Sequence, residues 1–205
     1  ASTGDTSASA AKYAAYCRDR LRCIVMVAEG KISPAQMYQA QDAGAVVLAL
    51  RADGFDVCMK VIQEFCANHP EIVLVNSKNA MRVVGQETIS LEIFQDLGWK
   101  VPDWLVIPIG NAGNGTAQMS AWRVLKDMGI IDRLPGIIFA QTQRANTIVR
   151  WIKSGFHSYE PGQVGPTIAS AMNIQDPVSF PRIQHFRSFF QIEGFDVSEA
   201  DIAST

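Results

Sequence analysis

The sequence contains few of the residues that bind metals or form disulfides: four cysteines and three histidines among 205 residues. No C-x-x-C pair, His-Glu-x-x-His motif or metal-spaced carboxylate cluster is present, so neither a metal site nor a disulfide framework is expected. The cysteines stand in apolar or helical surroundings, which predicts buried thiols in a reducing compartment. They are Cys17, Cys23, Cys58 and Cys66.

Long apolar runs and blocks of one charge are also missing. The apolar runs at residues 23–28 and 45–50 are far shorter than the roughly 20 residues of a membrane-spanning helix. Lysine and arginine total 18 against 20 acidic residues, without a basic block, so neither nucleic acid nor a membrane is expected as a partner. Because the chain does not begin with Met and no strand precedes its first loop, we interpret it as a segment of a longer protein, the parent.

What is present is an alternation of short apolar runs and helix-length segments, with 48% hydrophobic residues overall. This pattern predicts an α/β fold built from parallel βαβ units. Strands are expected at residues 22–28, 45–50, 72–75, 104–109 and 136–141. Helices are expected at residues 6–20, 33–43, 55–68, 83–97, 116–128, 144–154 and 182–190. A polar turn at 76–79 suggests two domains, 1–82 and 83–205, and residues 154–166 read as a loop.

Two loops rich in small residues precede predicted helices. The first comprises residues 1–10, and the second is the glycine loop 110–114, which follows the predicted strand 104–109. Free backbone N–H groups at a helix N-terminus favour an anion such as a carboxylate or phosphate. The second loop reads G-x-x-G-x-G, with Gly110, Gly113 and Gly115, so it is neither the dinucleotide fingerprint nor a nucleoside-triphosphate loop. A plain N-cap and a tight turn remain the alternatives.

Two cations stand beside predicted strand ends. Lys31 follows the first strand, and Arg82 follows the polar turn after the third. Ligands of open α/β sheets bind at the carboxyl ends of strands, so these cations and the two loops suit a phosphorylated substrate and cofactor.

Several motifs, in conserved order along the chain, resemble those of threonine synthases. They are Ser-Thr-Gly-Asp-Thr-Ser-Ala at 2–8, Glu-Gly-Lys-Ile-Ser at 29–33, Asn76-Ser77 through Asn79 to Arg82 with Gly85-Gln86, Val-Pro-Asp-Trp at 101–104, Gly-Asn-Ala-Gly-Asn at 110–114, Asp-Arg-Leu-Pro at 132–135, and Ala169-Ser170-Ala171 through Asp176-Pro177-Val178-Ser179. The Ser-Thr-Gly-Asp-Thr and Lys-Ile-Ser forms look most like the plant-type enzymes and their bacterial relatives.

The resemblance implies a fold type II pyridoxal-phosphate enzyme, similar in architecture to the tryptophan synthase β-subunit, with two α/β domains and the site in the cleft between them. Such an enzyme is a lyase of threonine biosynthesis that converts O-phospho-L-homoserine and water to L-threonine and phosphate. The implied cofactor is pyridoxal 5'-phosphate. A cytoplasmic location follows, or a plastid one if the source is a plant, and a homodimer is compatible with the family.

The resemblance also assigns roles to individual residues. The backbone of Gly110, Asn111, Ala112, Gly113 and Asn114 would hold the cofactor phosphate. Ser2, Thr3, Gly4 and Thr6 would line the loop that takes the substrate carboxylate. Lys31, Ser77, Arg82 and Asn111 would bind the substrate phosphate. Asp5 stands where the wider group has an asparagine facing the ring 3'-oxygen, so it would have to be protonated or turned away.

Two expected parts of the site are absent from this segment. The Schiff-base lysine of the family lies upstream of the Ser-Thr-Gly loop, and none of the seven lysines present stands in that motif. The residue facing the pyridine nitrogen lies downstream. We therefore expect the segment alone to be inactive. The alternatives are another fold type II enzyme, such as a threonine dehydratase or cysteine synthase, and a non-catalytic ligand-binding relative.

Overall fold

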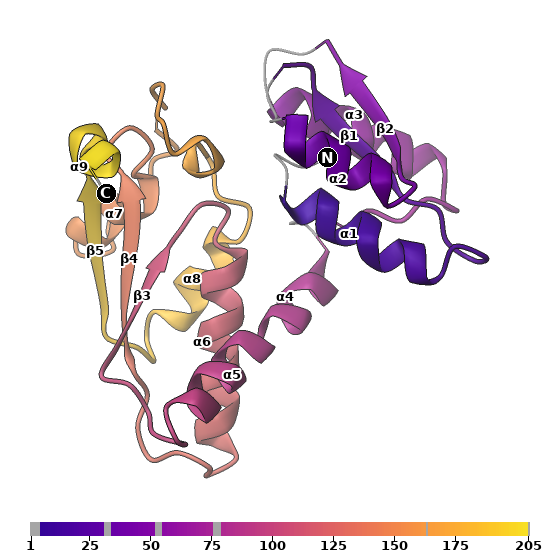
Figure 1. Ribbon diagram of the computed structural model, residues 1–205. Coiled ribbons are helices and arrows are strands. Elements are labelled where there is room, and N and C mark those ends of the chain that lie inside the picture. Colours follow the sequence, from indigo (N-terminus) through magenta and orange to yellow (C-terminus); the bar gives the residue numbers. More distant parts are fainter. Residues whose placement is uncertain (1–4, 31–33, 52–54, 76–78, 163, 205) are drawn as a thin grey trace. The chain divides into compact units, whose positions relative to one another are not determined.

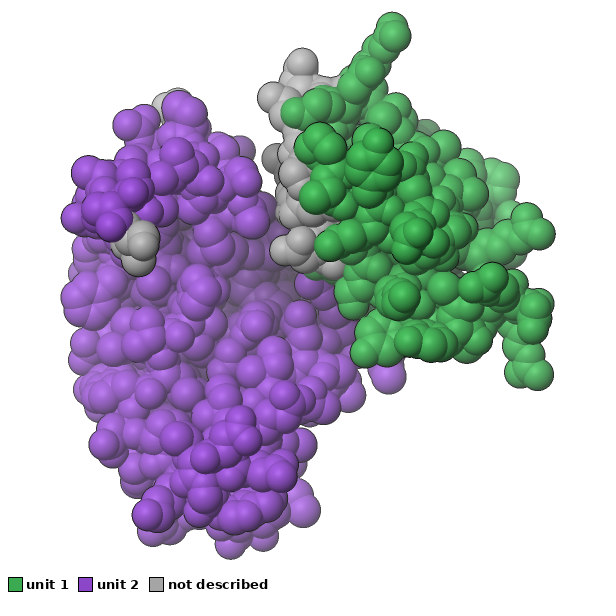
Figure 2. Space-filling view, in the orientation of Figure 1, with its two compact units in different colours: residues 1–79 green, residues 80–205 purple. Residues whose placement is uncertain are grey.

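The computed structural model describes residues 5–30, 34–51, 55–75, 79–162 and 164–204. These residues form two compact units, residues 1–79 and 80–205 (Figure 2). Each unit contains a parallel sheet with helices packed on it, which confirms the α/β class predicted from the alternating pattern.

Unit 1 has a two-stranded sheet between helices. Its elements are α1 (Asp5–Tyr16), β1 (Ile24–Ala28), α2 (Pro34–Asp42), β2 (Val46–Leu50) and α3 (Phe55–Asn68). The strands pair in parallel from Ile24 opposite Val46 to Ala28 opposite Leu50. Alternate residues of β1 enter two separate cores: Val25 and Val27 pack with α1 and α2, whereas Met26 packs with α3. This two-sided burial explains the unbroken apolar run of β1.

The strand predicted at residues 72–75 is wrong. The structure has no strand there, although the alternation is real: Leu74 packs against the core formed by Met26, Met59 and Ile62, while Val73 and Val75 are exposed. The Leu74 carbonyl accepts a hydrogen bond of 2.9 Å from Nδ2 of Asn79. An apolar run becomes a strand only when a neighbouring strand pairs with it, and none of the described residues of unit 1 does so here.

Unit 2 carries a three-stranded parallel sheet in the order β3-β4-β5 (Figure 1). Trp104 lies opposite Gly136 on the next strand, and Ile137 opposite Ile192. The elements of unit 2 are α4 (Ala80–Gln86), α5 (Thr88–Asp96), β3 (Trp104–Pro108), α6 (Gly113–Asp127), β4 (Gly136–Thr142), α7 (Thr147–Lys153), the short 3-10 helix η1 (Ser170–Met172), α8 (Phe180–Phe186), β5 (Ile192–Val197) and α9 (Glu199–Ser204).

Two expectations for unit 2 need correction. The single helix predicted at residues 83–97 is interrupted at Glu87 and forms two helices, α4 and α5. At the interruption, the N–H of Glu87 donates to the carbonyl of Val84, three residues earlier in the chain. The sequence reading also missed strand β5, which contains Gly194 and two acidic residues. That glycine is needed because a Cβ there would lie 3.2 Å from Cδ1 of Ile152 and 3.4 Å from Cα of Val149 on α7.

The core of unit 2 lies between one face of the sheet and its helices. Its fully buried side chains include Trp122, Phe139 and Trp151. Trp151 meets Phe156 and Phe180 edge to face, the arrangement that aromatic quadrupoles favour. This packing fixes β3, β4 and the helices that follow them, and therefore the loops at the carboxyl edge of the sheet.

The four cysteines are free thiols, but the prediction that all are buried is wrong. Cys58 is buried, Cys23 and Cys66 are partly buried, and Cys17 is exposed after the end of α1. Burial raises the pKa of the Cys23 and Cys58 thiols, because desolvation penalises the thiolate.

Candidate functional site

The glycine loop lies at the carboxyl end of β3 and leads directly into α6. Helix α6 begins at Gly113 and not, as predicted, at Thr116. Ala112 precedes it in the left-handed conformation, with φ of 64°. Because α6 begins at Gly113, Gly113 and Asn114 belong to the first turn of the helix. Their backbone N–H groups are therefore among the donors that a helix leaves without internal acceptors.

The hydrogen bonds around this turn hold it in place. The Ala112 carbonyl accepts from both the N–H and the hydroxyl of Thr116, at 3.0 and 2.7 Å. Oδ1 of Asn114 accepts from Nε2 of Gln118 at 2.5 Å. Within the described ranges, no protein acceptor is found for the N–H groups of Gly113 and Asn114. Together with the dipole of α6, they can bind an anion.

Asn111 connects the glycine loop to a distant segment. Its carbonyl accepts from the N–H of Ser179 at 3.0 Å, and its Oδ1 receives a long contact of 3.5 Å from the N–H of Val178. Gly110 lies beside the same segment, since a Cβ there would be 3.4 Å from the carbonyl oxygen of Ala171. Two stretches that the sequence motifs had singled out separately are thus neighbours in space.

Gln141, near the end of β4, connects the residue before the glycine loop to α7 through its side chain. The sequence analysis did not identify this residue. Only 2% of it is exposed. Its Nε2 donates to the Ile109 carbonyl at 3.1 Å, and its Oε1 accepts from the N–H of Val149 on α7 at 3.0 Å. One side chain therefore joins the residue before the glycine loop to the next helix. A polar residue near the end of an otherwise apolar strand is the only signal of this role in the sequence.

The remaining predicted site residues are placed to different degrees. Ser2, Thr3, Gly4, Lys31 and Ser77 lie outside the described residues. Asp5 is the first residue of α1, and Thr6, in its first turn, is partly buried. Arg82 lies on α4 and is partly buried, and this burial lowers the pKa of its guanidinium, which stays charged at neutral pH.

A second polar cluster lies at the same edge of the sheet. Glu199, on α9 after β5, accepts from the Thr142 hydroxyl through Oε1 at 2.6 Å and from the Ile168 N–H through Oε2 at 2.9 Å. The Thr142 hydroxyl bond, followed by the Ile168 N–H, lowers the pKa of the Glu199 carboxyl. The carboxylate therefore links the ends of β4 and β5 to the loop that contains Ile168.

The lowered pKa of Glu199 makes a prediction for acid stability. A depressed folded-state pKa contributes stability above the ordinary value of 4.5 and loses it as the pH falls through the folded value. We expect Glu199→Gln to weaken the dependence of Tm on pH below about pH 5. Glu92→Gln, which changes an exposed carboxylate on α5, is the control. Thermal unfolding of the parent at several pH values tests this prediction. If Tm falls equally steeply below pH 5 in the wild type and in Glu199→Gln, the prediction is wrong.

The close packing of Gly115 against Phe139 leads to a second prediction. A Cβ at Gly115 would lie 2.8 Å from Cε1 of Phe139, which is fully buried and cannot move aside. We expect Gly115→Ala to lower the free energy of unfolding by about 1–3 kcal/mol through overpacking. At Gly113 the nearest contact would be an ordinary 3.7 Å, so Gly113→Ala is the control. A double-mutant cycle measured by denaturant unfolding tests this, because Phe139→Leu should relieve the clash caused by Gly115→Ala. If the two substitutions change the free energy of unfolding additively, the overpacking explanation is wrong.

Other kinds of site find no support in the described part of the chain. No group of three or more His, Cys, Asp or Glu side chains in the described residues is arranged to hold a metal ion. None of the described helices has the length and apolar character needed to cross a bilayer. A groove of about 730 Å³, lined in part by Trp99, Lys100 and Ile130, lies before β3 and β4 and therefore at the amino edge of the sheet, away from the glycine loop.

Comparison with known proteins supports the motif-based resemblance. The chain is 43% identical over 184 residues to threonine synthase 2, chloroplastic, of Arabidopsis thaliana, covering 89% of this chain and 35% of that protein. It is 38% identical over 182 residues to threonine synthase of Methanocaldococcus jannaschii, covering 89% of this chain and 44% of the relative. It thus spans less than half the length of these curated relatives.

The fold is also found in solved structures. The crystal structure of threonine synthase from Escherichia coli superposes with a TM-score of 0.76 at 23% identity, covering 97% of this chain and 47% of that one. The sequence also matches the family described as pyridoxal-phosphate dependent enzyme over residues 1–205. With its parallel α/β units and the glycine loop that opens α6, the chain belongs to the pyridoxal-phosphate-dependent enzyme family.

Proposed function

We propose that the parent of this chain is a threonine synthase, which converts O-phospho-L-homoserine and water to L-threonine and inorganic phosphate with pyridoxal 5'-phosphate as cofactor. The carrying observation is identity of 38–43% to proteins named threonine synthase over about nine-tenths of the chain. A homodimer, and a cytoplasmic or plastid location, are part of the same proposal.

The glycine loop fits the phosphate of that cofactor. Gly113 and Asn114 present backbone N–H groups at the N-terminus of α6, and Gly110 and Gly113 have no side chain to block a close approach. Gly110, Asn111, Ala112, Gly113 and Asn114 would hold the phosphate. When bound, the cofactor supplies an electron sink that makes the Cα and Cβ protons of the substrate removable.

The chain's own residues would bind and orient the substrate. Arg82 provides a fixed cation on α4, and with Lys31, Ser77 and Asn111 it is proposed to bind the phosphate that leaves. A cation at the leaving group stabilises the charge that develops as the Cγ–O bond breaks. It also orients the substrate and favours phosphorylated over unphosphorylated homoserine. Ser2, Thr3, Gly4 and Thr6 are proposed to bind the substrate carboxylate.

Among the residues proposed to contact the cofactor, Asp5 is the one whose negative charge is unfavourable at its proposed position. An ionised carboxylate facing the oxygen of the cofactor ring would repel it, so the proposal requires Asp5 to be protonated or turned away. The segment itself, lacking the family's Schiff-base lysine, is proposed to be inactive by itself.

The decisive assay follows phosphate and threonine together. The parent, loaded with pyridoxal 5'-phosphate, is given O-phospho-L-homoserine, and we expect the two products in equal amounts. L-Homoserine, which lacks the phosphate, is the substrate control. Failure to release phosphate despite bound cofactor would overturn the proposal, and 2-oxobutyrate formed rapidly from L-threonine would then indicate a dehydratase.

A further inference from the structure

The side-chain amide of Gln86 lies beside the glycine loop. Gln86 is the last residue of α4, and its Oε1 atom is 3.7 Å from the position that a Cβ would take at Gly113. In a helix the Cα–Cβ bond tilts toward the N-terminus, so this position lies toward the end of α6 that carries the free N–H groups. The amide of Gln86 is therefore next to the N-terminus of α6.

Helix α4 packs against α6 along one of its sides. Arg82 and Gln86 are partly buried, whereas Met81, Val84 and Gly85 are exposed. Because Arg82 and Gln86 are four residues apart, they share one face of the helix. The same face of α4 thus carries the cation proposed to bind a phosphate and the amide beside the glycine loop.

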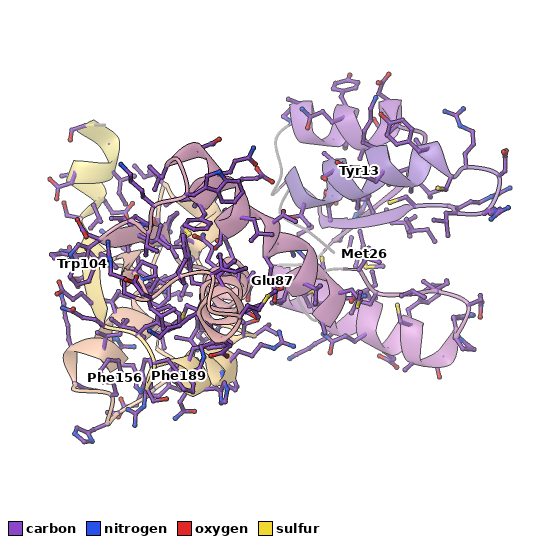
Figure 3. The ribbon with its side chains drawn as sticks, turned by 90° about the horizontal axis from the view of Figure 1, so that it is seen from below. Tyr13, Met26, Glu87, Trp104, Phe156 and Phe189 are labelled. Carbon is purple, nitrogen blue, oxygen red and sulfur yellow. The ribbon has the colours of Figure 1, made fainter. Side chains whose placement is uncertain are left out.

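Hydrogen bonds fix the C-terminal end of α4 against α6. The hydroxyl of Ser120, on α6, donates at 2.7 Å to Oε1 of Glu87, the residue after Gln86. In Figure 3, Glu87 marks the place where α4 and α5 meet beside α6. The buried hydroxyl of Ser90 donates at 3.4 Å to the Gln118 carbonyl on α6. Both bonds join this junction to the helix that the glycine loop opens, so Gln86 is held next to the loop.

Two other polar side chains near the loop already have protein partners. The Thr116 hydroxyl donates to the Ala112 carbonyl, and Nε2 of Gln118 donates to Oδ1 of Asn114. Among the described residues, the side-chain amide of Gln86 has no hydrogen-bond partner. A partly buried amide gains free energy from an acceptor, and turning the carboxamide by half a rotation brings its two N–H donors to the place that Oε1 occupies.

We infer that Gln86 is a further residue of the phosphate site, and that its Nε2 donates to an oxygen of the cofactor phosphate held at the glycine loop. This inference rests on the proposed placement of that phosphate at residues 110–114 and not on the proposed reaction. A hydrogen bond to a charged oxygen is about twice as strong as one between neutral groups. Helix α4 then serves the cofactor through Gln86 and the substrate through Arg82, one turn earlier.

Cofactor binding by the parent tests the inference without measuring activity. Absorbance titration of the cofactor-free parent gives Kd for pyridoxal 5'-phosphate and for pyridoxal, which lacks the phosphate. We expect Gln86→Leu to raise Kd for the phosphorylated cofactor by about 10–100-fold, the usual loss for one hydrogen bond to a charged group. Gln86→Glu should raise it by about a further tenfold, because the introduced carboxylate repels the phosphate and competes for the N–H groups of α6. Kd for pyridoxal should change less than about twofold.

Two control variants accompany the titrations. Gln95→Glu makes the same change of charge at an exposed position of α5 and should leave both dissociation constants unchanged. Gly113→Asp tests the placement of the phosphate itself, because a side chain fits there without a clash and brings a carboxylate to the loop. Thermal unfolding of each variant shows that it is folded before it is titrated.

Three results would overturn the inference. If only Gly113→Asp weakens binding of the phosphorylated cofactor, the phosphate lies at the loop without a contact to Gln86. If neither Gly113→Asp nor the Gln86 variants weaken it, the placement at residues 110–114 is wrong as well. Equal losses for pyridoxal 5'-phosphate and pyridoxal would show that Gln86 acts through packing and not through the phosphate. The conversion of O-phospho-L-homoserine is tested separately by the product assay, so failure of one proposal is distinguishable from failure of the other.

Discussion

Arg82→Ala in the parent is expected to lower kcat/KM for O-phospho-L-homoserine by about 10²–10³-fold, the usual effect of removing one donor that stabilises developing negative charge. Arg82 is partly buried on α4, and the burial that lowers its pKa also strengthens its interaction with an anion, because less water screens the charge. Because the phosphate is present both on the bound substrate and in the transition state, both KM and kcat should change.

The matched controls separate this role from a general effect of charge. Arg20→Ala removes an exposed arginine that follows α1 and should leave the kinetics within about twofold of wild type, as is usual for an isolated exposed charge. Arg82→Lys keeps the charge but loses the planar, two-pronged donor, so it should recover only part of the activity. Steady-state kinetics with phosphate release measures all three. Changes below about threefold for Arg82→Ala would exclude a phosphate-binding role.

Gln141→Leu is expected to destabilise the parent by about 2–6 kcal/mol. The substitution keeps most of the side-chain volume but removes both hydrogen bonds, leaving the Ile109 carbonyl and the Val149 N–H unpaired in the core. Each buried polar group left without a partner costs about 1–3 kcal/mol. Because Ile109 precedes the glycine loop, the affinity for pyridoxal 5'-phosphate should fall as well.

Gln143→Leu provides the matched control two residues away. Its side chain is exposed, and the position is held by a backbone bond of 2.9 Å from its N–H to the Val197 carbonyl, which the substitution leaves intact. We expect a change within about 0.5 kcal/mol there. Denaturant unfolding and titration with pyridoxal 5'-phosphate measure both variants. Equal stability of the Gln141 and Gln143 variants would show that the buried amide does not hold the loop.

Local patterns were sufficient where the determinants lie close in sequence. Helix α3 occupies residues 55–68 as predicted, since its apolar side and its flanking breakers are local features. The glycine loop was likewise located from the strand that precedes it and from its small residues. The family resemblance rested on ordered short motifs and was confirmed by similarity to threonine synthases over about nine-tenths of the chain.

Predictions failed where a distant partner decides the outcome. Residues 72–75 have a strand's composition but no strand to pair with, and β5, with Gly194 at its centre, is a strand because β4 pairs with it and α7 packs on it. Gln141 reaches the Ile109 carbonyl across 32 residues of sequence, a relation that no local pattern contains.

The sequence by itself determined the α/β class, the position of the glycine loop and the family, because periodicity, glycine spacing and motif order are properties of neighbouring residues. Only the tertiary structure decided that the 177–179 segment meets Asn111 and that Gln141 holds the loop. These features depend on hydrogen bonds and packing between residues far apart in the chain, which form only when the parallel strands bring their ends to one edge.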